Sequence, residues 1–176
     1  MGIFRRAGLC PNHPCNFLSS GPAMTALFTL LPDAVCTIAA ESKQVILDRL
    51  ARCFAGVYGL DPVLVLERLE EREKLGSTGF GRGVAIPHAR IPDLARPVAV
   101  FLRLETPVAF EAADGMPVDL VFGLLSPEAA GAAHLHALAA LSRMMRDDKM
   151  HAALGEATNA EALYALLANS IDRDAA

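Results

Sequence analysis

His88 lies in a sequence context typical of a reactive side chain. It follows the glycine-rich run GSTGFGRG (76–83) and a short apolar stretch over residues 84–86. Glycines allow positive φ angles and a close approach by another molecule, while Pro87 restricts its own φ and keeps the preceding residue extended. We therefore expect His88 at the end of a strand, with little bulk in front of it. Because a neutral imidazole is a competent nitrogen nucleophile at pH 7, His88 is a candidate for covalent catalysis.

Two further histidines lie in an alanine- and leucine-rich segment that predicts a helix over residues 132–147. Helical periodicity places His134 on the apolar face with Leu141, whereas His136 lies on the opposite, solvent-facing side. Because residues two apart on a helix cannot converge on one ion, this pair is not expected to bind a metal. A buried imidazole needs a hydrogen-bond partner. Either His134 is an ordinary core histidine bonded to a backbone carbonyl, or it meets His88.

Arg72 is the cation best placed to serve an anion at His88. It borders the apolar face of a predicted helix and lies near its C-terminal end, just before the glycine run. Within the charged stretch EEREK (70–74), it could simply be a solvated residue that favours the helix dipole. With an anion near His88, its planar guanidinium would instead offer a bidentate contact.

The spacing of other residues does not support a cofactor or metal site. The glycine run fails the G-x-G-x-x-G pattern and no P-loop motif occurs, so no nucleotide cofactor is expected. Cys10, His13 and Cys15 supply three ligands at an unusual spacing, whereas a closed zinc site needs four. Cys36 and Cys53 fall in apolar patterns, and we expect them to be buried thiols of a reducing compartment.

Composition argues against several classes of function. The chain of 176 residues fits one domain with a substantial core. Its net charge of −4, without a basic block, argues against nucleic acid or an anionic membrane as a partner. Every apolar run is interrupted before the ~18 residues that a membrane span needs, so membrane insertion is not expected. No signal-peptide pattern follows the early arginine pair, and we therefore expect a cytoplasmic protein.

The periodicity of apolar residues predicts a single-domain α/β fold. Helices are expected to flank strands that are apolar on both faces, which is typical of a layer sandwich with a mixed β-sheet. Residues 1–24, rich in proline, asparagine and glycine, are expected to form a disordered lead. The predicted elements are a helix from Ser42 to Gly59, a helix from Asp61 to Gly76, strands over 84–86, 97–104 and 117–125, a helix start at Ser126–Pro127–Glu128, a helix over 132–147 and a last helix over 158–169 capped by Thr158 or Asn159.

Three stretches of the chain resemble one protein family. REKLGSTGFGRGVAIPHAR (72–90), ETPVAFEAADGMPVDLVFGLLSP (105–127) and HLHALAALSRMMRD (134–147) are similar to type-2 IIA proteins of the bacterial phosphoenolpyruvate-dependent phosphotransferase system. The resemblance covers residues 25–170, and the likeness is strongest to the nitrogen-regulatory subgroup (IIA-Ntr), in which GSTG is followed later by HLH. Residues 1–24 have no counterpart in the pattern, and 171–176 form a C-terminal tail.

The resemblance implies a role for each of three residues. His88 would be the phosphoacceptor, forming a tele-phosphohistidine with a phosphoryl group from an HPr- or NPr-type phosphocarrier protein. His134 would assist the transfer, and Arg72 would contact the phosphoryl group. Neither a metal nor a cofactor is implied. Because a carboxylate beside the phosphate would repel it, we expect little charge around His88.

Two functions are consistent with this resemblance. The first is a regulator of the nitrogen branch, whose phosphorylation changes its binding to protein targets of the transporter or sensor-kinase class. The alternative is a fructose- or mannitol-type transport component that passes the phosphate to a separate IIB protein. A metal hydrolase built on the histidines is a more distant third possibility, which metal analysis of the purified protein would test.

Overall fold

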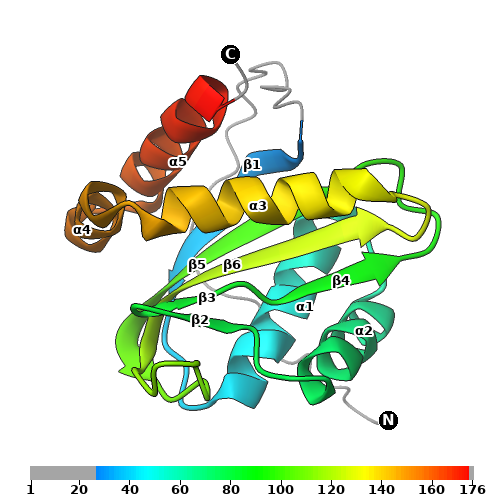
Figure 1. The fold of residues 1–176 in the computed structure, drawn as a ribbon, viewed down its shortest axis with the longest axis horizontal. Helices are drawn as coiled ribbons and strands as arrows, with labels where there is room; N and C mark the ends of the chain where they lie inside the picture. The colour runs from blue at the N-terminus through cyan, green and yellow to red at the C-terminus, as the bar shows by residue number, and fades with distance from the viewer. Residues whose placement is uncertain (1–26, 175–176) are drawn as a thin grey trace, which may run out of the picture.

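The computed structural model describes residues 27–174, so the predicted disordered lead over 1–24 lies outside the described residues. The described chain contains six strands and five helices (Figure 1). In chain order they are β1 (Thr29–Ile38), α1 (Lys43–Tyr58), α2 (Pro62–Lys74), β2 (Gly79–Gly81), β3 (Val84–Ala85), β4 (His88–Ile91), β5 (Val98–Val108), β6 (Val118–Pro127), α3 (Ala132–Arg146), α4 (Asp148–Glu156) and α5 (Ala160–Asp174).

The strands form one mixed sheet in the order β1-β5-β6-β3-β2, with β4 also paired to β6. Strand β6 runs antiparallel to β5 but parallel to β3 and β4, and β1 is parallel to β5. The short strands β3 and β4 pair with successive parts of β6, so both lie along one of its sides. Between them, the carbonyl of Pro87 accepts a hydrogen bond from Leu124 N at 2.9 Å, which continues the ladder up to His88.

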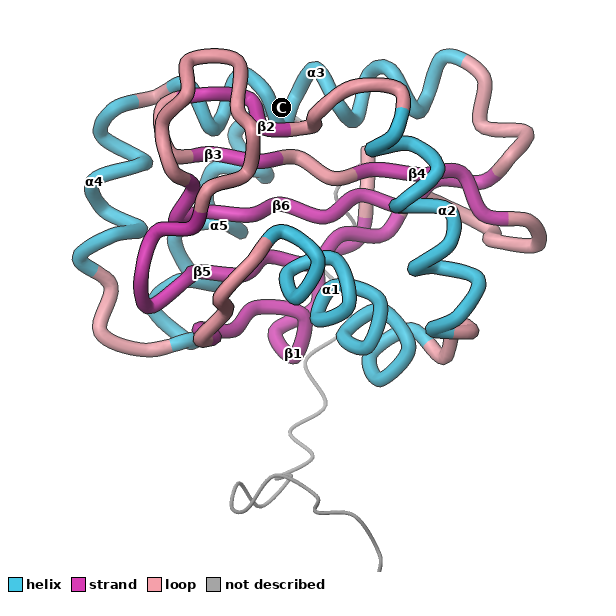
Figure 2. The backbone as a smooth tube through the Cα atoms, turned by 90° about the horizontal axis from the view of Figure 1, so that it is seen from below, coloured by secondary structure: helices cyan, strands magenta, loops and turns pink. Residues whose placement is uncertain are grey.

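Helices cover both faces of this sheet. Helices α1 and α2 pack together on one face, while α3 and α5 lie across the other (Figures 1 and 2). On the first face, a Cβ atom at Gly123 would lie 2.8 Å from a methyl carbon of Leu50, so glycine allows α1 to approach β6 closely. Strand β6 is buried along nearly its whole length. The predicted layer sandwich with a mixed sheet flanked by helices is confirmed.

Local capping residues explain why the bounds of the first two helices were predicted closely. The Ser42 side chain accepts from Val45 N and Gly59 closes α1 in the left-handed conformation, as predicted. Asp61 caps α2 with Pro62 at its first position, although the helix is capped at Leu75, one residue before the predicted Gly76.

Other elements differ from the sequence prediction. Ser126 and Pro127 do not start a helix: they end β6, and α3 begins after Gly131, whose φ is 50°. His88 does not lie at the end of the preceding strand, β3, but is the first residue of a further strand, β4. The prediction also missed β1, β2 and helix α4, which follows directly on α3. For the last helix, Asn159 is the capping side chain and accepts from Ala162 N at 2.8 Å.

Candidate functional site

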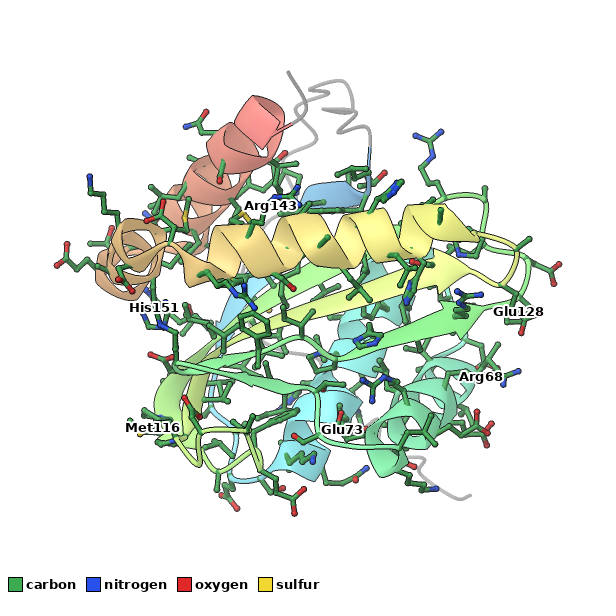
Figure 3. All side chains as sticks on the ribbon, in the orientation of Figure 1. Arg68, Glu73, Met116, Glu128, Arg143 and His151 are labelled. Atoms are coloured by element: carbon green, nitrogen blue, oxygen red, sulfur yellow. The ribbon has the colours of Figure 1, made fainter. Side chains whose placement is uncertain are left out.

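A pocket of about 600 Å³ lies where α2, β4 and the start of α3 meet. It brings together all three residues that the sequence predicted. Figure 3 shows two of its rim residues, Arg68 on α2 and Glu128 after β6, at the same end of the molecule. The pocket is lined by Arg68, Glu71, Arg72, Leu75, His88, Ala89, Arg90, Glu128 and His134.

The imidazole of His88 is held by a hydrogen bond to its own strand. Its Nδ1 lies 2.8 Å from the carbonyl oxygen of Ile86. Because a carbonyl oxygen only accepts, Nδ1 must carry the proton. Burial, followed by the charge of Arg72, lowers the pKa of His88 despite the bond to Ile86, so the ring is neutral at pH 7. A neutral ring protonated at Nδ1 has its lone pair on Nε2, which is therefore the nucleophilic atom.

Arg72 contacts this nucleophilic nitrogen directly. Its Nε donates to His88 Nε2 at 3.0 Å, and one of its terminal nitrogens donates to the Gly76 carbonyl at 2.9 Å. Gly76 has a φ of 143°, a conformation that L side chains rarely adopt, and this turn presents its carbonyl to Arg72. The guanidinium thus lies next to the position that a group bonded to Nε2 would take.

His134 lies close to His88 in the pocket. The two ring centroids are 5.6 Å apart, with the planes inclined by 48°. His134 is only 7% exposed. Burial, and then the proximity of His88 and Arg90, lowers its pKa to about 4, so it is neutral at pH 7. Its partner is not a backbone carbonyl, as for an ordinary core histidine, but the hydroxyl of Ser126, with 2.9 Å between Nδ1 and Oγ. His136 is exposed, as predicted.

Glu73 ties the glycine run to α2, a role that the sequence analysis missed. Its carboxylate accepts from Thr78 N at 2.9 Å and from Thr78 Oγ1 at 2.5 Å, and Lys43 contacts it at 2.8 Å. Burial alone would raise the pKa of Glu73, but the bonds from Lys43 and Thr78 hold it below its ordinary value. The position of Glu73 next to Arg72, five residues before a threonine in the glycine run, is the signal that could have identified it.

The prediction of little charge around His88 is wrong. Three arginines and two glutamates line the pocket. The glutamates at the rim are offset by Arg68, which lies 3.3 Å from Glu71 and 3.7 Å from Glu128. This pairing leaves Arg72 and Arg90 to give the pocket a positive character, which suits an anion.

The other candidate groups do not join this site. Cys36 and Cys53 are partly buried rather than fully buried. Within residues 27–174 no cluster of three or more His, Cys, Asp or Glu residues could hold a metal ion. The set Cys10, His13 and Cys15 lies outside the described residues. In the same described range, no helix combines the length and the apolar character needed to cross a membrane.

The alignments of this chain with two relatives span most of its sequence. A nitrogen regulatory protein of Bradyrhizobium diazoefficiens is 45% identical over 138 residues, which cover 78% of this chain and 90% of that protein. A nitrogen regulatory protein of Escherichia coli K12 is 40% identical over 131 residues, or 74% of this chain and 80% of that protein.

Solved structures resemble the described fold. The crystal structure of nitrogen regulatory protein IIA-Ntr from Neisseria meningitidis superposes with a TM-score of 0.74 at 36% identity, over 78% of this chain and 95% of that one. The mannitol IIA protein of E. coli shares the fold, with a TM-score of 0.68 at 21% identity, over 80% and 99% of the two chains. The family model described as "Phosphoenolpyruvate-dependent sugar phosphotransferase system, EIIA 2" matches residues 32–170. Because that match spans nearly the whole described fold, the chain belongs to the EIIA 2 family of the phosphoenolpyruvate-dependent phosphotransferase system and is similar to its nitrogen regulatory members.

Proposed function

We propose that His88 accepts a phosphoryl group on Nε2 from a phosphohistidine of an HPr- or NPr-type phosphocarrier protein. The observation that carries this proposal is the bond between Nδ1 and the Ile86 carbonyl, because it places the proton on Nδ1 and the lone pair of the ring on Nε2. The product is a tele-phosphohistidine, since the tele nitrogen is Nε2. No cofactor or metal takes part in this proposal.

The transfer follows from the geometry of the pocket. The lone pair of His88 Nε2 attacks phosphorus in line, the bond to the donor nitrogen breaks, and its electron pair returns to the donor imidazole. As the His88 ring gains positive charge, its Nδ1–H bond to the Ile86 carbonyl strengthens. Arg72 moves from Nε2 to the phosphoryl oxygens, where two of its N–H groups can act together. His134 donates a hydrogen bond to another oxygen.

The surface around the pocket supports docking by a protein donor. Leu75, at the C-cap of α2, lines the pocket and is 85% exposed. An exposed leucine beside a positive pocket offers the partner an apolar contact next to the phosphate-binding groups. Transfer of a phosphoryl group between two histidines requires the two proteins to dock so that both imidazole rings lie within contact distance of the same phosphorus atom.

We propose a regulatory output for the phosphorylated protein. The similarity to nitrogen regulatory proteins supports this choice over sugar transport. A dianionic group on His88 changes the charge of the docking face, so protein targets of the transporter or sensor-kinase class would bind one phosphorylation state better than the other. This function would be exercised in the cytoplasm, where a phosphocarrier protein can meet the chain.

The phosphorylation proposal is tested by incubating the protein with phosphoenolpyruvate, enzyme I and the phosphocarrier protein, followed by intact-mass measurement. We expect one added phosphoryl group, labile in acid and stable in base, as for a phosphoramidate. The His88→Ala variant should gain none, whereas the matched control His136→Ala should be modified fully. Modification of His88→Ala would contradict the proposed acceptor.

A chase distinguishes the two branches of the family. The phosphorylated protein is mixed with a IIB protein and sugar, and the phosphate is followed. A regulator is expected to retain its phosphate, whereas rapid transfer to the IIB protein and then to sugar would assign the chain to the fructose- or mannitol-type transport branch.

A further inference from the structure

Ser126 contacts His134, the second histidine of the site. It is the penultimate residue of β6, is fully buried, and places its Oγ 2.9 Å from Nδ1 of His134. In the sheet Ser126 pairs with Arg90 of β4, and His88 pairs with Leu124, two residues earlier on both strands. Ser126 therefore lies on the strand next to that of His88, and its hydroxyl is linked to His88 only by way of His134.

The contact between Ser126 and His134 determines where the His134 proton lies. A neutral imidazole carries one N–H, on either Nδ1 or Nε2. If Nδ1 donated to Oγ, the hydroxyl proton of Ser126 would be buried without an acceptor, because among residues 27–174 the hydroxyl bonds only to His134. If the hydroxyl donates to Nδ1, both groups are satisfied. The second arrangement puts the proton of His134 on Nε2.

The position of that proton matters for chemistry at His88. His134 lines the same pocket as His88, and its Nδ1 is occupied by Ser126, so Nε2 is the nitrogen available to the pocket. A phosphoryl oxygen can only accept a hydrogen bond. The Nε2–H form of His134 therefore stabilises the phosphoryl group, whereas the Nδ1–H form would present a lone pair and repel it.

We propose that Ser126 is a positioning residue that holds His134 as the Nε2–H tautomer, so that His134 donates to the phosphoryl group transferred to His88. This inference rests on the proposed phosphorylation of His88. Ser126 itself contacts neither the phosphate nor the acceptor, and its effect on transfer must pass entirely through His134.

Kinetics of phosphorylation test this dependence. Ser126→Ala should slow phosphorylation about tenfold, the effect of misdirecting one hydrogen bond to the transferred group. Ser126→Thr restores the hydroxyl and should recover most of the rate. Ser142→Ala removes a serine of α3 that does not line the pocket, serves as the matched control and should leave the rate unchanged.

A double variant separates positioning from a general structural role. In the His134→Ala background, Ser126→Ala should cause no further loss of rate, because the group through which it acts is gone. A further tenfold loss in that background would overturn the proposal. So would a wild-type rate in Ser126→Ala.

The tautomer can also be measured without any phosphate donor. In ¹⁵N-labelled protein, the ring-nitrogen shifts of His134 should show a protonated Nε2 and an unprotonated Nδ1, and Ser126→Ala should lose this preference while His88 keeps its Nδ1–H form. A wild-type His134 protonated on Nδ1 would refute the inference. This measurement remains decisive for Ser126 and His134 even if the protein is not phosphorylated, an outcome that would count against the proposed function of His88 instead.

Discussion

Three side chains carry the chemistry that we propose for the pocket. His88 provides the nucleophilic Nε2, because its Nδ1 is tied to the Ile86 carbonyl at 2.8 Å. Arg72 on α2 donates to that nitrogen, and the ring of His134 on α3 lies 5.6 Å from the ring of His88. Both rings are kept neutral by burial and by nearby positive charge. A neutral nucleophile beside a guanidinium is an arrangement that suits a dianionic phosphoryl group.

The fork of donors on Arg72, rather than its charge alone, should be needed for transfer. In Arg72→Lys we expect phosphorylation to slow by about tenfold or more, because an ammonium cannot hold the Gly76 carbonyl and a phosphoryl oxygen with the same planar geometry. Initial rates of phosphate incorporation measure the effect. Arg52→Lys, an exposed arginine paired with Asp48 on α1, is the matched control. Equal rates for both variants would make Arg72 an ordinary surface cation.

At the scale of elements, contacts with the segment between β5 and β6 hold the glycine run (76–83) in place. Gly79 in β2 is packed so tightly that a Cβ atom would lie 2.6 Å from Cα of Ala112. Nearby, Ser77 Oγ donates to the Phe110 carbonyl at 2.8 Å. These contacts hold the turn that precedes β3 and β4, and so hold the strand that carries His88.

Replacement of Gly79 should therefore destabilise the protein. For Gly79→Ala we expect the free energy of unfolding to fall by about 1–3 kcal/mol, because backbone rather than a flexible side chain must move. Gly56→Ala in α1 is the control: nothing lies within 4 Å of its Cβ position, so the better helix former should stabilise by up to about 1 kcal/mol. Denaturant unfolding measures both, and destabilisation by the two substitutions alike would contradict this explanation.

The elements also show what could be predicted from sequence and why. Helices α1 and α2 follow from capping residues that act within a few positions, so their bounds were predicted closely. Strand β1 was missed because Pro32 and Asp33 interrupt its apolar pattern, and the structure accommodates them with a register shift between Leu30 and Val35. The sequence Ser126–Pro127–Glu128 has the pattern of a helix start, but Ser126 and Pro127 pair with β4 instead. This pairing depends on the tertiary fold, so the local pattern could not predict it.

Local sequence patterns singled out each site residue separately, and the family resemblance implied that the three act together. His88, Arg72 and His134 each had a local reason to be singled out. Their convergence depends on β4 pairing beside β6 while α2 and α3 cover opposite faces of the sheet, and that arrangement is a property of the whole molecule. For the same reason, the charged rim with Arg68 and Glu128 was not anticipated, since those residues are far apart in sequence.

The burial of His134 makes the stability of the whole molecule depend on pH. Its pKa is about 4 in the folded protein against an ordinary value of 6.5, so the unfolded chain binds more protons between these values and stability falls as the pH drops through this window. Between pH 7 and 5, this histidine should reduce the free energy of unfolding by about 2 kcal/mol. The lowered pKa of His88 acts in the same direction.

Denaturant unfolding at the two pH values measures this dependence. His134→Ala should lose about 2 kcal/mol less than the wild type over the same interval, because the titrating group is gone. His136→Ala removes an exposed histidine from the same helix and should keep the wild-type pH dependence. An unchanged dependence in His134→Ala would show that other groups govern the acid sensitivity.

The hydrogen bond from Arg72 Nε to His88 Nε2 has a consequence for chemical selectivity. The lone pair of Nε2 already accepts a hydrogen bond in the resting protein, so an uncharged alkylating agent must first displace the guanidinium and offers it no charged oxygen in exchange. A phosphoryl group brings its own negatively charged oxygens, to which the guanidinium can transfer as the nitrogen is released. The same contact should therefore lower the reactivity of resting His88 toward uncharged alkylating agents and leave it responsive to anionic phosphoryl donors.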